Sequence, residues 1–200
     1  MRTAVQTVEV REAILDATDD FLARFGYKKM TIDDLAQAVG IGKGSIYLHF
    51  SSKEEIALSH VDRIVERLKT ELKRIAARKT SPEERLRLML LTRVLHRFDS
   101  VQHYTQSLDD ILSAIRPKLL ARRKTYFEEE AEILSAVIEE GQTTKIFQCG
   151  NALEISKTLL LATNSLLPFS LTTQELGLRG DIEAKTLRIA DLLLKGISQI

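Results

Sequence analysis

Residues 30–56 of this 200-residue chain read MTIDDLAQAVGIGKGSIYLHFSSKEEI, and this stretch decides the fold. Thr31 stands three residues before Asp34, which is a spacing typical of a helix N-terminus where each side chain caps a backbone N–H. Gly40 is well placed for the left-handed turn that often ends a helix. The pattern therefore predicts a short helix between Thr31 and Gly40.

The second half of the stretch predicts another short helix, which follows a tight Gly-Ile-Gly turn. Ile46 and Phe50 are four residues apart, so both can face a core. Polar side chains remain for the other faces, and they are Lys43, Ser45, Tyr47 and His49. Two short helices joined in this way, with a longer amphipathic helix on each side, predict a helix-turn-helix. Its second helix can enter the roughly 12 Å wide major groove of DNA.

The rest of the chain also has the pattern of helices. It holds three prolines and nine glycines, and no segment shows sustained period-two alternation. Amphipathic runs predict further helices near residues 10–25, 52–77, 81–98, 107–116, 118–141, 151–167 and 182–197. Pro117 is expected to interrupt one of them, so that its two parts meet at an angle. The predicted class is all-α with about nine helices, divided into residues 1–53 and 54–200.

The overall composition excludes several classes of protein. The chain carries 29 Lys and Arg against 28 Asp and Glu, so it is not a strongly basic protein that coats nucleic acid. A hydrophobic fraction of 44% argues against intrinsic disorder. No run reaches the roughly 18–20 apolar residues of a membrane span, and the N-terminus lacks the apolar run of a secretory signal, so a cytoplasmic location is expected.

Positive charge is concentrated in the helix-turn-helix region, although the whole chain is balanced. Between residues 21 and 53, five basic residues face two acidic ones, namely Arg24, Lys28, Lys29, Lys43 and Lys53 against Asp33 and Asp34. Such a local excess of cations is typical of a surface that meets phosphates. The sequence therefore predicts that any contact with DNA is confined to this region.

Metal and catalytic chemistry find little support in the sequence. His96 and His103 flank Asp99, but their separation crosses a predicted helix end, and no second carboxylate or thiol is near in sequence. Solvated or pocket-lining histidines are the favoured interpretation. Serine, histidine and acidic residues occur, but none lies in a nucleophile-elbow or other catalytic pattern. We therefore expect no enzyme, no metal and no cofactor.

Two further features have simple structural interpretations. Cys149 is the single cysteine, so it has no partner in the chain for a disulfide and is expected to be an inert thiol. The basic run 122–124 precedes the acidic run 128–130, which at helical spacing predicts ion pairs on a solvated face.

Residues 30–56, together with ILDATDDFLARFGY at residues 14–27, resemble the TetR family of one-component bacterial transcription regulators. The rest of the chain agrees with that family in length and helix order alone. The resemblance implies phosphate contacts from Thr31, Tyr47, His49 and Lys53. It implies contacts to the floor of the groove from Gly42, Lys43, Gly44, Ser45 and Leu48. Among these, Lys43 suits guanine O6 and N7, and Leu48 suits a thymine methyl group.

The same resemblance divides the remaining residues into supporting roles. It implies a packing core for the helix-turn-helix from Ile32, Leu35, Val39, Ile41, Ile46 and Phe50. It implies an effector pocket in the C-terminal domain, for which the pattern suggests Met89, Arg93, Val94, Phe98, Leu112, Ile115, Phe127 and Phe169. It also implies a two-fold dimer through the last two long helices, whose apolar surface is wider than one core needs. A large monomeric core that contains both helices is the alternative.

The expected function is thus a homodimeric repressor that a small-molecule effector releases from a palindromic DNA operator. Two alternatives remain open at this point. The first is a helical carrier of a small molecule or lipid that does not bind DNA. The second is an activator or a chromosome-organising protein with the same helix-turn-helix.

Overall fold

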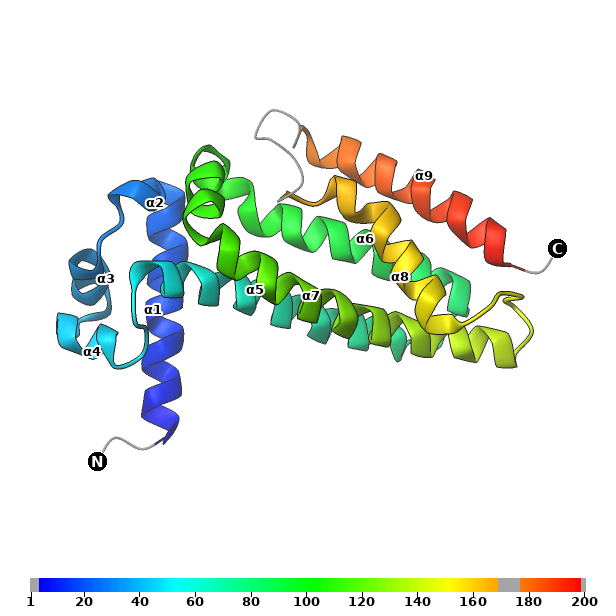
Figure 1. The fold of residues 1–200 in the computed structure, drawn as a ribbon, viewed down its shortest axis with the longest axis horizontal. Coiled ribbons are helices and arrows are strands. Elements are labelled where there is room, and N and C mark those ends of the chain that lie inside the picture. The colour runs from blue at the N-terminus through cyan, green and yellow to red at the C-terminus, as the bar shows by residue number, and fades with distance from the viewer. Residues whose placement is uncertain (1–3, 169–176, 199–200) are drawn as a thin grey trace. The chain divides into compact units, whose positions relative to one another are not determined.

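The structure is a computed structural model that describes residues 4–168 and 177–198 (Figure 1). In these residues the chain forms nine α-helices and no strand, which confirms the expected all-α class. The helices are α1 (Ala4–Arg24), α2 (Gly26–Lys29), α3 (Ile32–Val39), α4 (Lys43–Tyr47), α5 (Lys53–Ala76), α6 (Pro82–Val101), α7 (Thr105–Thr143), α8 (Ala152–Thr163) and α9 (Arg179–Ile197). None of the described helices is both long and apolar enough to cross a bilayer.

The helices group into two compact units. Residues 1–63 with 101–120 form the first, here named the head, and residues 64–100 with 121–200 form the second, here named the bundle. This division differs from the expected boundary after residue 53, because the first part of α5 packs against α1. Arg63 donates hydrogen bonds to the Leu15 carbonyl at 2.9 Å and to Asp16 at 2.6 Å. A functional division at residue 53 stays a prediction.

The head is built as the local sequence predicts. Asp34 N–H donates to the Thr31 hydroxyl, and Thr31 N–H donates to the Asp34 carboxylate, both at 3.1 Å, so the capping box is formed. Gly40 has φ +71°, the left-handed conformation that ends α3. Leu35, Ile46 and Phe50 are buried, and they support the turn between α3 and α4 from inside. The two short helices therefore rest on an apolar core.

Two local features of the head differ from the sequence-based expectation. The first helix ends near residue 25 as predicted, before Gly26 with φ +76°, but the chain then forms one more helical turn, α2, which the sequence pattern did not indicate. The prediction that Pro117 divides a helix is wrong, because α7 continues through it. Pro117 and Ser113 are both exposed, so water can satisfy the Ser113 carbonyl, which lacks its helical N–H partner.

The bundle has an apolar interior that draws on all of its helices. Its buried members include Leu68, Leu72, Ile75, Leu86, Met89, Leu90, Leu134, Val137, Ile138, Leu159, Leu160, Ala190 and Leu194. The predicted helix starts are present, since the Ser81 hydroxyl accepts from Glu84 N–H at 3.1 Å and the Asn151 side chain accepts from Glu154 N–H at 3.0 Å. Within this unit α8 packs against α9 (Figure 1).

The connection between α7 and α8 is fixed to the end of α9. Phe147 pairs with Ser198 as a single antiparallel bridge, and Gln148 N–H donates to the Ile197 carbonyl at 2.9 Å. The Phe147 ring lies over Gly141, where a methyl group would come within 2.1 Å of it. Only glycine fits under this ring, so Gly141 has a packing role.

Candidate nucleic-acid interface

The helix α4 and the residue after it present large side chains to solvent. Leu48 is 80% exposed and Tyr47 is 50% exposed, whereas Ile46 between α4 and the core is fully buried. Ser45 N–H donates to the Gly42 carbonyl at 2.8 Å, and Phe50 N–H donates to the Ile46 carbonyl at 3.0 Å. The surface is therefore rigidly supported while two large side chains remain uncovered.

Gly42, before α4, and Gly44, within it, carry no side chain that would cover the backbone on the outer face. A methyl group built at Gly42 or Gly44 would meet no atom within 4 Å, so neither glycine is required for packing. Their small size instead keeps the backbone open to a close approach from outside. Ser45 and His49 are half-buried beside them, and Lys43 is exposed.

Thr31, a predicted phosphate contact, already has a structural task. Its hydroxyl donates to the Asp34 carboxylate at 2.6 Å and accepts from Asp34 N–H. Thr31 is nevertheless exposed, and α3 begins directly after it with acidic Asp33 and Asp34 in the first turn. A phosphate contact by Thr31 stays a prediction.

Lys53, another predicted phosphate contact, is the first residue of α5 and packs against an aromatic ring. Its ammonium lies 4.3 Å from the centroid of the Tyr27 ring and 3.4 Å from the Lys28 carbonyl oxygen. Burial lowers the pKa of Lys53. Burial, with the carboxylate of Glu54 nearby, raises the pKa of Tyr27 to about 12. The cation is thus held at one place, and a phosphate would have to approach it there.

The positive excess predicted for this region is partly neutralised in the fold. Lys43 pairs with Asp33 at 2.7 Å, and the hydrogen bond between them raises the pKa of Lys43. Lys28 pairs at 2.8 Å with Asp110, an acidic residue of α7 that is remote in sequence. In the described part of the chain, Arg24 and Lys29 are exposed and form no ion pair. The sequence pattern did not indicate either pairing.

One cation near the core of the head was not among the predicted residues. The guanidinium of Arg11, on α1, lies 5.1 Å from the centroid of the buried Phe50 ring. It also approaches Glu12 at 3.7 Å. Helical spacing alone could not have related Arg11 to Phe50, because the contact joins α1 to the segment after α4.

The residues suggested for an effector pocket fall into different places. Met89, Val94 and Phe98 are buried in the bundle, and Phe127 is half-buried there. Leu112 and Ile115 belong to the head. Phe169 lies outside the described residues. Pocket lining therefore stays a prediction for these residues.

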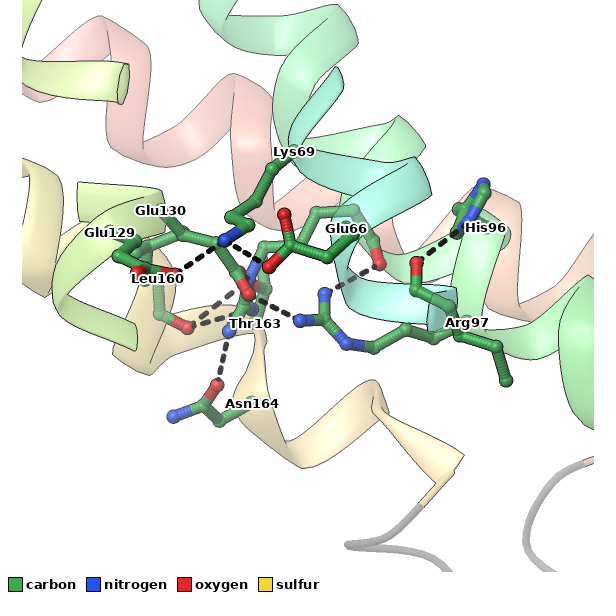
Figure 2. A network of polar contacts seen from close by, with 11 residues as sticks. Glu66, Lys69, His96, Arg97, Glu129, Glu130, Leu160, Thr163 and Asn164 are labelled. Atoms are coloured by element: carbon green, nitrogen blue, oxygen red, sulfur yellow. Dashed lines mark hydrogen bonds and ion pairs between the residues drawn. The ribbon is translucent and has the colours of Figure 1, made fainter. Parts of the chain in front are cut away.

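The eighth suggested residue, Arg93, is the centre of a buried ionic network. Its Nε donates to Glu130 at 2.6 Å, and Arg97 forms a second, short ion pair with the same carboxylate (Figure 2). The side chains of Arg93 and Glu130 are 3% and 1% exposed. Burial lowers the pKa of Arg93 to about 10 against the opposing effect of Glu130. Burial alone would raise the pKa of Glu130, but Arg97 and Arg93 together hold it below its usual value.

The same arginine also ties down the C-terminal end of α8. Its two terminal nitrogens donate to the Leu160 carbonyl at 3.2 Å, the Thr163 hydroxyl at 2.9 Å and the Asn164 side chain at 2.7 Å (Figure 2). A cation at this end of a helix is also favoured by the helix dipole. The network thus joins α6, α7 and α8.

The acidic run 128–130 behaves differently from the prediction of a solvated face. Glu130 is buried, Glu128 pairs with Lys157 of α8 at 3.1 Å, and Glu129 pairs with Lys69 of α5 at 2.6 Å. The prediction of a solvated face is therefore wrong for Glu130, while Glu128 and Glu129 pair with lysines of other helices. Sequence spacing could not reveal this, since the four partners (Lys69, Arg93, Arg97 and Lys157) come from other helices.

The histidine and cysteine candidates are also occupied by ordinary contacts. His96 Nε2 lies 3.2 Å from the Ile64 carbonyl oxygen, and Asp99 binds the guanidinium of Arg179 at 2.8 Å. The Gln142 amide donates to the Cys149 carbonyl at 3.0 Å. Among the residues that the structure describes, no three His, Cys, Asp or Glu side chains gather as a metal site.

Known proteins resemble the chain in two ways. By sequence, it is 38% identical over 50 residues to an uncharacterized HTH-type transcriptional regulator, YhgD of Bacillus subtilis, covering 25% of this chain and 26% of that protein. It is 36% identical over 62 residues to the HTH-type transcriptional repressor BepR of Brucella suis, covering 31% and 30% of the two chains. The chain thus matches less than half the length of these relatives.

By structure, the likeness extends over nearly the whole chain. A transcriptional regulator from Cytophaga hutchinsonii superposes with a TM-score of 0.77 at 23% identity, covering 94% of this chain and 98% of that one. This likeness supports the fold as a whole. Residues 14–59, which contain the interface described above, match the family model of the bacterial regulatory proteins of the tetR family. The helix-turn-helix region of the chain is therefore that of the tetR family of bacterial regulatory proteins.

Proposed function

We propose that this protein is a DNA-binding transcriptional regulator that acts as a homodimeric repressor in the cytoplasm. The observation that carries the proposal is the exposed surface at α4. Tyr47 and Leu48 are exposed there, next to the buried Ile46 and Phe50 and to the capped helix α3. A large exposed apolar side chain beside a lysine and two open glycines suits the floor of a major groove. Matching relatives named as regulators support the same function.

The last two helices of the described chain offer a surface for the second subunit. Leu161 of α8 is 61% exposed and Leu192 of α9 is 72% exposed, in a unit where α8 and α9 pack against each other. A helix-turn-helix monomer reads too few base pairs for tight binding, so such proteins usually pair on two half-sites. Pairing through α8 and α9 would cover both leucines.

We infer that an effector acts on the bundle, where Met89, Val94 and Phe98 supply apolar surface. The helix α5 runs from the head into this unit and gives a continuous connection between the two. An effector that binds better when the two heads are wrongly spaced would lower operator binding through typically ~1–3 kcal/mol of coupling. Identification of small molecules that purify with the protein would test this inference.

A titration of the protein against promoter fragments and random duplexes, with gel retardation as readout, tests DNA binding. Replacing Tyr47 or Lys53 by alanine should weaken binding to all duplexes and flatten the dependence on salt. Replacing Lys43 should mainly relax sequence preference. Val8→Ala, at another exposed apolar side chain of the head, is the control.

Absence of binding to any duplex would contradict the proposal and favour a helical carrier instead. Equal effects of the Tyr47 and Lys43 variants on affinity and on preference would contradict their separate roles. The position of bound sites relative to promoters then separates a repressor from an activator or a chromosome-organising protein.

Sedimentation velocity tests the second subunit. Leu161→Glu with Leu192→Glu should convert a dimer to a monomer and reduce operator binding, because two charges would be buried at the interface. Leu120→Glu, at a leucine of similar exposure in the head, should leave the dimer intact. A wild-type monomer at micromolar concentration would contradict the proposed pairing.

A further inference from the structure

The ion pair between Asp33 and Lys43 joins the two helices of the helix-turn-helix on their outer side. Lys43 Nζ lies 2.7 Å from Asp33 Oδ2, and the two side chains are 51% and 67% exposed. Asp33 takes no part in the cap of α3, which is made by Thr31 and Asp34. Its place in the first turn of α3 is favoured by the helix dipole, but the capping box is complete without it.

Folding stability gives little reason for the pair. Ion pairs this exposed contribute little to stability, because water screens them and both side chains lose conformational freedom. On a surface that meets phosphates, a carboxylate also opposes binding to every duplex. Asp33 therefore has a cost for DNA affinity that its exposed ion pair and its place in the first turn of α3 offset only in part.

We propose that Asp33 is a specificity-determining positioning residue, which directs the ammonium of Lys43 toward base edges and away from phosphates. This inference rests on the proposed DNA-binding function. An ammonium has three N–H donors, so Lys43 can keep one hydrogen bond to Asp33 and offer the others to guanine O6 and N7. A lysine held in this way cannot readily turn to a neighbouring phosphate, so it contributes less to binding that is independent of the DNA sequence.

The variant Asp33→Asn keeps the size of the side chain and removes its charge. The probes are a random-sequence duplex pool and a duplex that the wild-type protein selects from that pool. Because the change releases one exposed cation, we expect affinity for the random pool to rise roughly two- to fivefold. The logarithmic salt dependence should steepen by about 0.9, the value of one added phosphate contact. The ratio of selected to random affinity should fall.

Two further proteins separate positioning from a simple change of net charge. Asp20→Asn removes a negative charge from an exposed acidic residue of α1 and should alter neither the salt slope nor the ratio. In a Lys43→Met background, Asp33→Asn should have no more effect than Asp20→Asn, because the proposed action passes through Lys43. Helical circular dichroism of each variant checks that α3 is retained.

Three outcomes would overturn the inference while leaving DNA binding in place. They are an unchanged random-pool affinity for Asp33→Asn, a shift equal to that of Asp20→Asn, and a full effect of Asp33→Asn in the Lys43→Met background. A wild-type protein that binds neither probe would overturn the proposed function together with the inference.

Discussion

The Lys43–Asp33 ion pair of the head and the network of Arg93, Arg97 and Glu130 in the bundle lie in opposite environments. In the head, Lys43 pairs with Asp33 at the surface, where both side chains are at least half exposed. In the bundle, Arg93 and Arg97 share Glu130 in the interior, where each of the three is less than one-tenth exposed. An external anion can therefore compete for Lys43, whereas the burial of Arg93 and Arg97 excludes such competition.

The two environments predict different contributions of these ion pairs to folding stability. Breaking an exposed ion pair costs little free energy, because water solvates both charges. Removing the carboxylate of a buried pair costs much more, because its cationic partners then have neither a counter-charge nor water around them. The bundle network reaches three helices, including the end of α8, so its loss should be felt across the whole unit. The four predictions below test this contrast, beginning with the largest expected effect.

Glu130→Gln should destabilise the bundle by about 3–5 kcal/mol, because Arg93 and Arg97 would stay buried with no counter-charge. Urea denaturation followed by circular dichroism measures the loss. Glu132→Gln, an exposed change two residues later on α7, is the control and should have almost no effect. A loss below about 1 kcal/mol for Glu130→Gln would mean that the buried network is no stronger than a surface pair.

Alkaline pH should instead weaken the head, through Tyr27. Its pKa is raised from 10.0 to about 12, so the fold favours the protonated phenol. The resulting stability is complete below about pH 10 and is lost as pH rises toward 12, by about 2–3 kcal/mol for two pKa units.

Comparison of wild type with Tyr27→Phe isolates this effect from the titration of lysines. As pH rises from 9 to 12, the unfolding midpoint of the wild type should fall relative to that of Tyr27→Phe, because the phenylalanine variant has no proton to lose. Tyr47→Phe, at the exposed tyrosine, should follow the wild-type curve. Parallel curves for wild type and Tyr27→Phe would contradict the raised pKa.

The same substitution at two glycines should have opposite consequences. Gly141→Ala should cost about 1–3 kcal/mol, because the new methyl group overlaps the Phe147 ring, from which it would lie 2.1 Å. Gly44→Ala meets no atom within 4 Å and lies in a helix, so stability should hold or rise by up to about 1 kcal/mol. Thermal melting measures both. If Gly44→Ala lost as much stability as Gly141→Ala, the head surface would be less open than the structure shows.

The smallest expected effect concerns the cap of α3. Thr31→Ala removes the acceptor for Asp34 N–H and should cost about 1 kcal/mol. Amide hydrogen exchange should localise the loss to the first turn of α3. Thr70→Ala, at a bundle threonine whose hydroxyl only donates to the Glu66 carbonyl, should leave stability almost unchanged. Equal losses at both positions would contradict a special role for the capping box.

The fold could be predicted from sequence where its cause is local. Capping pairs such as Thr31 with Asp34 and Ser81 with Glu84 are three residues apart, and Gly40 acts through its own backbone. The exposure of Tyr47 and Leu48 also follows from helical spacing against buried Ile46 and Phe50. These features need no knowledge of distant parts of the chain.

The remaining features depend on contacts between distant residues. Glu130 lies 37 residues from its partner Arg93 along the chain. The acidic run 128–130 therefore did not indicate that Glu130 is buried. The pairing of Lys28 with Asp110 and the ring of Tyr27 under Lys53 were unpredictable for the same reason. Helix α7 continues through Pro117, where Ser113 and Pro117 are both exposed to water, and this exposure could not be predicted from the sequence around the proline.

The bridge between Phe147 and Ser198 has a practical consequence for engineering the C-terminus. A deletion that removes Ile197 and Ser198 would take away the acceptor of the Gln148 N–H and the bridge partner of Phe147. Fusion partners or affinity tags at this end are therefore best attached through a flexible spacer. A displacement of the end of α9 would disturb the backbone contacts of Phe147 and Gln148 in the turn that follows α7.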